Sequence, residues 1–241
     1  MRTPVNLDKN HVEAILFDLD DTLFDRTLAQ SEALSKILSM FPDLFGQIDE
    51  CVALDAFLEA DRLAIQSESH GFTLGEARDL RSRTFLDLLG LVPNRTQEIT
   101  QTYITKYRES VTPVSGAMSA LQVLHGSFPL GLVSNGYPEV QHIKIDSLKI
   151  RSLLEFTLIS EEIGIRKPDS AIFLMAAQMI GAEPAKCLFV GDSYENDVVG
   201  ANGVGMQTCW LNRGGSSIKG EVIPDLQISQ MEQLLQAVDA G

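Results

Sequence analysis

The chain has 241 residues, 44% of them hydrophobic, so it can bury a full core and has the length of one large domain or of a core with an inserted domain. Its formal net charge of -14 and its pI near 4.6 argue against a nucleic-acid polymer or an anionic membrane as a partner, because both bind basic surfaces. No stretch approaches the ~18 consecutive apolar residues of a membrane span, and residues 1–10 lack the apolar segment of a secretory leader, so we expect a cytoplasmic protein.

The cysteines indicate a reducing compartment. Cys51, Cys187 and Cys209 are odd in number and lack the spacing of metal ligands. Cys187 and Cys209 lie within apolar runs that are typical of strands. We therefore expect three reduced thiols in the core.

The first element is a short apolar run at residues 14–17, which ends abruptly in acidic residues. The run is too short for a helix and too apolar for a surface loop, which predicts a strand buried on both faces in a parallel sheet. Ligands of such sheets bind beyond the carboxyl ends of the strands. Asp18 and Asp20 follow two residues apart, so they start on one face of the strand and can converge on one ion or substrate, with the Thr22 hydroxyl beside them.

The next interval, residues 26–112, has helical periodicity throughout. Apolar residues recur at spacings of three and four in four segments, near 28–41, 48–58, 74–89 and 99–107. No β-rich run interrupts the interval, although a βαβ unit needs only ~30 residues. This pattern predicts an inserted helical subdomain.

From residue 113 the chain alternates between strand and helix patterns. The predicted strands are 129–134, 156–160, 187–191, 207–211 and 225–228, and the predicted helices are 118–126, 140–150, 168–180 and 231–238. The alternation predicts an α/β fold, a doubly wound and mostly parallel sheet with helices on both faces. Its core comprises residues 1–25 and 113–241, and residues 26–112 form a helical cap.

Polar residues follow the later strands at the same edge of this sheet. Ser134 and Asn135 end the second strand, Lys167 lies downstream of the third, and Asp192 follows the fourth. Taken singly, each of these segments is typical of a turn or of a solvated helix start. Their common position at strand ends is better explained by one shared site.

The residue types at this edge indicate the chemistry. Asp18, Asp20 and Asp192 offer hard oxygen ligands of the kind that Mg²⁺ prefers, and several carboxylates at one place repel one another without a cation. Lys167 adds positive charge, and Ser134 adds a hydrogen-bond donor beside the backbone amides. Together these groups predict a binding site for a phosphoryl group, with Mg²⁺ as cofactor.

Four motifs in this order resemble those of the haloacid dehalogenase superfamily. They are Asp-x-Asp-x-Thr at 18–22, Ser134, Lys167, and Gly-Asp-x4-Asp at 191–197, and the resemblance extends over about residues 14–211. It implies a Rossmann-like core and a phosphatase-type site. The long helical interval after the first motif matches the caps that this superfamily inserts there.

The resemblance also implies a role for each residue. Asp18 is the expected nucleophile, which forms an aspartyl-phosphate, and Asp20 is the expected general acid and then base. Ser134 and Lys167 clamp the phosphoryl group, with Thr22 and Asn135 as further substrate contacts. Asp192 binds Mg²⁺ together with Asp18 and the carbonyl of Asp20. Asp197 lies next to these ligands and does not itself bind the metal. Phosphoryl transfer requires in-line positioning and neutralised charge, which such a set supplies.

The expected activity is therefore Mg²⁺-dependent hydrolysis of a small soluble phosphate ester, of the sugar phosphate or nucleoside monophosphate class. A 2-haloacid dehalogenase of the family would lack the second acid, whereas this chain has Asp20. A phosphomutase uses the same acids and stays open, and a phospho-accepting signalling module would place its acids on two strands and have no long insert. In the segment 136–146, His142 and Lys144 fit either a solvated helix face or substrate contacts. The oligomeric state stays open.

Overall fold

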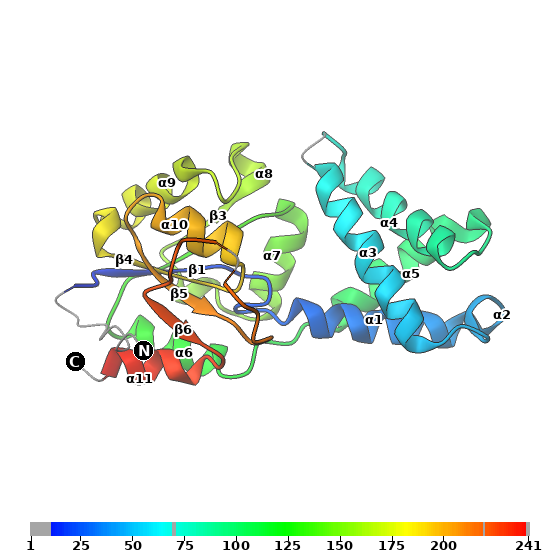
Figure 1. Ribbon diagram of the computed structural model, residues 1–241, viewed down its shortest axis with the longest axis horizontal. Coiled ribbons are helices and arrows are strands. Elements are labelled where there is room, and N and C mark those ends of the chain that lie inside the picture. The colour runs from blue at the N-terminus through cyan, green and yellow to red at the C-terminus, as the bar shows by residue number, and fades with distance from the viewer. Residues whose placement is uncertain (1–10, 69–70, 219, 240–241) are drawn as a thin grey trace. The chain divides into compact units, whose positions relative to one another are not determined.

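The computed structural model describes residues 11–68, 71–218 and 220–239 (Figure 1). The chain divides into two compact units, Met1–Asp25 with Thr112–Gly241, and Arg26–Val111. The first ten residues, for which we expected no leader, lie outside the described residues. Among the described helices, none is both long and apolar enough to cross a bilayer.

The first unit is built on a six-stranded sheet in which every neighbouring pair is parallel. Its strands are β1 (Ala14–Phe17), β2 (Leu130–Ser134), β3 (Phe156–Ile159), β4 (Cys187–Gly191), β5 (Gln207–Leu211) and β6 (Leu226–Ile228). They lie in the order β3-β2-β1-β4-β5-β6, which confirms the predicted doubly wound α/β fold. The chain leaves β1 toward β2 and returns to the other side at β4, so the strand order reverses between β1 and β4. Such a switch point opens a crevice at the carboxyl ends of the two strands.

Helices cover both faces of this sheet. In Figure 1, α9 (Ser170–Ile180) and α10 (Gly200–Asn202) lie on one face, and α6 (Ala117–His125) and α11 (Glu232–Asp239) lie on the other. Ala14 and Leu16 belong to the same buried cluster as Ile172 and Phe173 of α9. Since side chains alternate along a strand, the intervening residues of β1 face the opposite layer. β1 is therefore wholly buried, as its apolar run predicts.

Shorter elements connect these layers. The helices α7 (Pro138–Ser147) and α8 (Ser160–Ile163) flank β3, and a π-helix, Tyr194–Val199, follows β4. Among the described residues of this unit, 3-10 segments lie at Arg151–Leu153 and Pro184–Lys186, and a further one, Pro93–Arg95, belongs to the second unit. The prediction that Pro168 lies in the first turn of a helix was wrong. Helix α9 starts at Ser170, because the Asp169 carboxylate accepts the Ala171 N–H at 2.9 Å and caps the helix one residue after the proline.

The second unit is helical, as its periodicity predicts. Its helices are α1 (Arg26–Met40), α2 (Pro42–Phe45), α3 (Glu50–Glu68), α4 (Leu74–Leu88) and α5 (Thr96–Glu109). Aromatic side chains fill its core, including Phe57, Phe85 and Tyr103. Burial raises the pKa of Tyr103 well above its ordinary range, so this phenol stays neutral.

The cysteine prediction was correct in part. Cys187 and Cys209 are buried free thiols, and burial raises the pKa of Cys187 to about 11. Cys51 is also free, but it is exposed on α3, so the prediction of a core position was wrong for this residue. Ala53, two residues later on the same helix, is buried in the core of the helical unit instead.

Candidate active site

The centre of the site is a buried lysine between two carboxylates. Asp18 follows β1 directly and is tied to β4 because its N–H donates to Val190 O at 2.9 Å. The ammonium of Lys167 donates to Asp18 Oδ1 at 2.5 Å and to Asp197 Oδ1 at 2.7 Å. Burial opposes the charge on Lys167, but the two carboxylates outweigh it and hold its pKa above the ordinary value. Lys167 therefore carries a permanent positive charge at the end of β1.

The side chain of Asn135 holds the backbone of Lys167. Its Nδ2 donates to Lys167 O at 2.9 Å, and its Oδ1 accepts the Lys167 N–H at 2.9 Å. This pair of hydrogen bonds joins the end of β2 to the loop before α9. The predicted site residues Ser134, Asn135 and Lys167 are thus brought together, and Asn135 uses both ends of its amide to position the lysine.

Three carboxylates meet at the switch point. Oxygens of Asp18, Asp192 and Asp197 all lie within 4.8 Å of one another. Burial, reinforced by the neighbouring carboxylates, raises the pKa of Asp18 to about 7 and that of Asp192 to about 9, although Lys167 opposes both shifts. The raised pKa values show that two ionised carboxylates side by side are unfavourable here without a cation. A divalent cation would stabilise the ionised form of both acids. The donor set fits Mg²⁺ by its hard oxygens and its excess negative charge.

The turn after β4 fixes the position of the acidic cluster. Asp197 Oδ2 accepts the Ser193 N–H at 2.9 Å, and an added Cβ at Gly191 would collide with the Asp197 carboxylate. The indole Nε1 of Trp210 donates to the carbonyl of Asp192 at 2.8 Å. Glycine is therefore required at position 191, and the tryptophan of β5 holds the backbone of Asp192.

Asp20 has partners on α7 that no motif indicates. Lys144 Nζ lies 2.6 Å from Asp20 Oδ1 and 2.9 Å from Oδ2, and Gln141 Nε2 donates to Oδ2 at 3.1 Å. The same Nε2 lies 2.7 Å from Ser134 Oγ. Lys144 is only 4% exposed, which excludes the solvated-face alternative for this residue. A lysine and a glutamine three residues apart in α7 were the available signal, because they share one helix face.

The loop that carries the first motif is anchored by a second cation. Asp21 has a positive φ of 58°, and Arg213 lies 2.8 Å from its carboxylate and 2.9 Å from that of Asp25. Arg213 follows β5 and belongs to none of the four motifs, so no local pattern marks it as a site residue. The predicted substrate contact Thr22 is fully buried, and its hydroxyl has no hydrogen-bond partner among the described residues.

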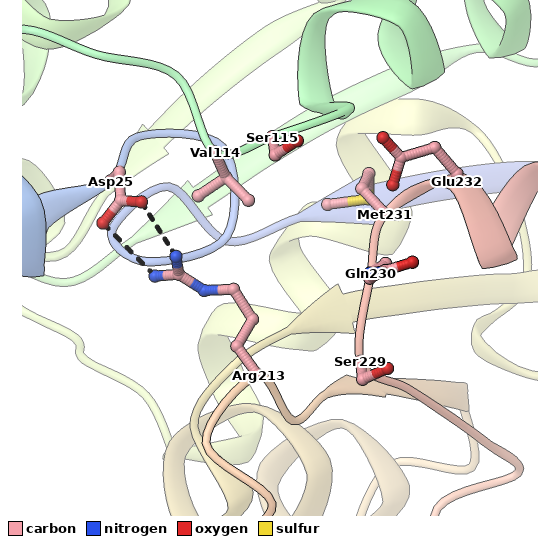
Figure 2. A pocket seen from close by; sticks show the side chains of 8 residues that line it. All are labelled: Asp25, Val114, Ser115, Arg213, Ser229, Gln230, Met231 and Glu232. Atoms are coloured by element: carbon pink, nitrogen blue, oxygen red, sulfur yellow. Dashed lines mark hydrogen bonds and ion pairs between the residues drawn. The ribbon is translucent and has the colours of Figure 1, made fainter.

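A pocket of about 210 Å³ opens beside this loop (Figure 2). It is lined by Asp25, Val114, Ser115, Arg213, Ser229, Gln230, Met231 and Glu232. Figure 2 shows the Arg213 guanidinium turned toward the Asp25 carboxylate, so its charge is already paired there. None of the predicted site residues lines this pocket.

Comparison with known proteins places these motifs in a family. A model of haloacid dehalogenase-like hydrolases matches residues 12–205. The chain belongs to this family. Over 223 residues it is 26% identical to the pyrimidine 5'-nucleotidase YjjG of Escherichia coli, an alignment that covers 92% of this chain and 96% of the relative. It is 28% identical to a phosphoserine phosphatase of Thermus thermophilus, with 94% and 99% covered.

Solved structures of haloacid dehalogenase-like proteins share the fold. The magnesium-bound HAD-hydrolase YfnB of Bacillus subtilis superposes with a TM-score of 0.79 at 24% identity and covers 95% of this chain and 99% of its own. Several 2-haloacid dehalogenases also match over most of the chain. Likeness at this identity establishes the fold, which phosphatases and dehalogenases have in common.

Proposed function

We propose that this hydrolase is a Mg²⁺-dependent phosphomonoesterase that works through an aspartyl-phosphate on Asp18. The observation that carries the proposal is the second acid of the first motif. Asp20 lies at the same strand end as Asp18, and its carboxylate contacts Lys144 and Gln141. A dehalogenase needs no such acid, because halide leaves without a proton.

The residues divide the chemistry between them. A carboxylate oxygen of Asp18 attacks phosphorus while the bond to the ester oxygen breaks, and Asp20 gives its proton to that departing oxygen. Water then attacks the aspartyl-phosphate and gives a proton to Asp20, and the bond between phosphorus and Asp18 breaks. Lys167, fixed by Asn135 and paired with Asp197, supplies positive charge to the equatorial oxygens, and Ser134 supplies a hydroxyl donor.

The metal belongs to the acidic cluster. Asp18 and Asp192 would hold Mg²⁺ together with the carbonyl of Asp20, and Asp197 would stay with Lys167, whose ammonium already donates to its carboxylate. When bound, Mg²⁺ supplies charge that offsets both the carboxylates and the phosphoryl group. The magnesium bound in the similar YfnB structure supports this choice of cation.

The relatives and the acidic net charge of the chain support a substrate class. The similar curated proteins include a nucleotidase, a phosphoserine phosphatase and an N-acylneuraminate-9-phosphatase, which are all named for small phosphate monoesters. We assign a small soluble ester of the sugar phosphate or nucleoside monophosphate class. We assign the helical unit, residues 26–112, as the inserted cap of this hydrolase.

The test is phosphate release from a panel of nucleoside monophosphates, sugar phosphates and phosphoserine, with Mg²⁺ and with a chelator. Saturable phosphate release that needs Mg²⁺ supports the proposal. Chloride release from 2-chloropropionate without phosphate release from any ester would identify a dehalogenase instead. Transfer of phosphate to a second position of a hexose phosphate, with little free phosphate, would identify a phosphomutase.

A further inference from the structure

The buried pair on helix α7 has no role in the phosphoryl chemistry described so far. Gln141 and Lys144 are 1% and 4% exposed, and both contact Asp20 at the end of β1. A buried ammonium is costly unless a charged partner compensates it. The Asp20 carboxylate, in contact with Lys144 Nζ through both oxygens, is such a partner.

The amide of Gln141 makes a second connection to the same carboxyl. Its Nε2 lies within hydrogen-bond distance of Asp20 Oδ2, Ser134 Oγ and Asn135 O, at 3.1, 2.7 and 3.0 Å. Its Oε1 is buried and has no hydrogen-bond partner among the described residues. An apolar residue would fill this space without leaving an acceptor unpaired, so packing alone does not account for a glutamine here.

Both donors contact the Asp20 carboxylate and so restrict its side chain. Lys144 also lies over the ring of Phe24, 5.0 Å from its centroid, so its ammonium is fixed between that ring and the carboxylate. Asp20 itself stands on a loop, and its side chain is 24% exposed, against 9% for that of Asp18. A partly exposed aspartate would sample several rotamers, and the pair on α7 selects one of them.

We propose that Lys144 and Gln141 are positioning residues that orient the Asp20 carboxyl for proton transfer to the leaving oxygen, with both donors on Oδ2 and the transferred proton on Oδ1 in that step. The inference rests on the proposed phosphatase function. It adds that protonation of the leaving group depends on Lys144 and Gln141. Without the pair, Asp20 is present but misplaced, so the chain loses the part of its rate that comes from protonating the leaving group. Replacing Lys144 alone leaves substrate binding at Ser134, Lys167 and the metal site the same, whereas Gln141 also contacts Ser134 Oγ.

The test uses the full chain and two aryl esters, 4-nitrophenyl phosphate and phenyl phosphate. The value of kcat/KM for each ester reports the first transfer to Asp18, in which the leaving group departs. We expect Lys144→Met to reduce this value for phenyl phosphate about ten-fold more than for 4-nitrophenyl phosphate, since the nitrophenolate departs without a proton. Gln141→Met should act in the same direction. Lys149→Met, at an exposed lysine just after α7, is the matched control and should leave both esters unchanged.

A double-mutant cycle separates positioning from loss of fold. In an Asp20→Asn background, Lys144→Met should cost no more than about two-fold, because the group that it positions is gone. An equal loss in both backgrounds, or an equal loss on both esters, would overturn the proposal, and circular dichroism of each variant identifies any that fail to fold. If the unmutated chain releases phosphate from neither aryl ester and from no ester of the panel, the phosphatase assignment itself fails. If it hydrolyses both and only Asp20→Asn discriminates between them, the assignment stands and the role of the α7 pair is refuted.

Discussion

Neutralising Asp192 should stabilise the metal-free protein, although the same change should abolish metal binding. In the absence of a cation, burial and the charges of Asp18, Asp197 and Asp21 raise the pKa of Asp192 from 3.8 to about 9. The folded state therefore favours the protonated acid, whereas the unfolded chain ionises near its ordinary pKa. Asp192→Asn removes this conflict at nearly constant volume.

The magnitude follows from proton linkage. A carboxyl whose pKa is higher in the folded state contributes its full stability below the unfolded pKa and loses it as the pH rises toward the folded value. Each pH unit between 3.8 and about 9 therefore costs the wild-type protein up to ~1.36 kcal/mol. At pH 5 the variant should be more stable by about 2 kcal/mol at most, and at pH 7 by about 4 kcal/mol at most.

Urea unfolding with a chelator, followed by tryptophan fluorescence at pH 5, 6, 7 and 8, measures this difference. Trp210 is the single tryptophan of the chain and lies in the α/β unit, where its indole contacts the Asp192 carbonyl, so the signal reports that unit alone. Titration with Mg²⁺ should change the same fluorescence in the wild type and not in the variant. Mg²⁺ should also stabilise the wild type increasingly as the pH rises.

Glu155→Gln is the matched control, because it neutralises an exposed acid of the same unit. It should change the free energy of unfolding little at every pH. The reasoning fails if the stability difference between wild type and Asp192→Asn does not grow with pH, or if the wild type is the more stable of the two at pH 8 in the presence of a chelator.

Three further outcomes concern turnover. Asp18→Asn should abolish phosphate release while the fold stays intact, because the amide removes the nucleophile, and residual activity in a preparation shown by mass spectrometry to be free of deamidation would contradict this. Activity should disappear with a chelator, return with Mg²⁺ and not return with Ca²⁺, whose looser coordination misplaces Asp18; a rate that ignores the chelator would count against the metal site. Asp20→Asn should slow hydrolysis of an alkyl phosphate by ~10²–10⁴-fold and that of an activated aryl phosphate much less, with the Mg²⁺ requirement preserved, and equal losses on both esters would remove Asp20 from the acid role.

The sequence by itself determined those features that depend on local pattern. A four-residue apolar run that ends in acids predicts a strand buried on both faces, and the acids that follow it must then lie at its carboxyl end. The order of the motifs along the chain placed Asp18, Ser134, Lys167 and Asp192 at one edge of a parallel sheet. The geometry of parallel strands makes this inference possible without knowledge of which strands are neighbours, because all carboxyl ends meet at the same edge.

Only the tertiary structure decided which charges pair. Lys167 lies between Asp18 and Asp197, and Lys144 meets Asp20 across 124 positions in the chain. Burial in α7 does not follow its apolar residues, because the structure buries Gln141 and Lys144 and leaves Val140 and Ile143 partly exposed. A polar residue becomes a core residue when a partner from elsewhere in the chain compensates its charge, and no local pattern records that partner. Two further features could not be predicted from the sequence for the same reason. These are the exposed position of Cys51 and the ion pairs of Arg213 with Asp21 and Asp25, which depend on how the elements pack and not on local sequence.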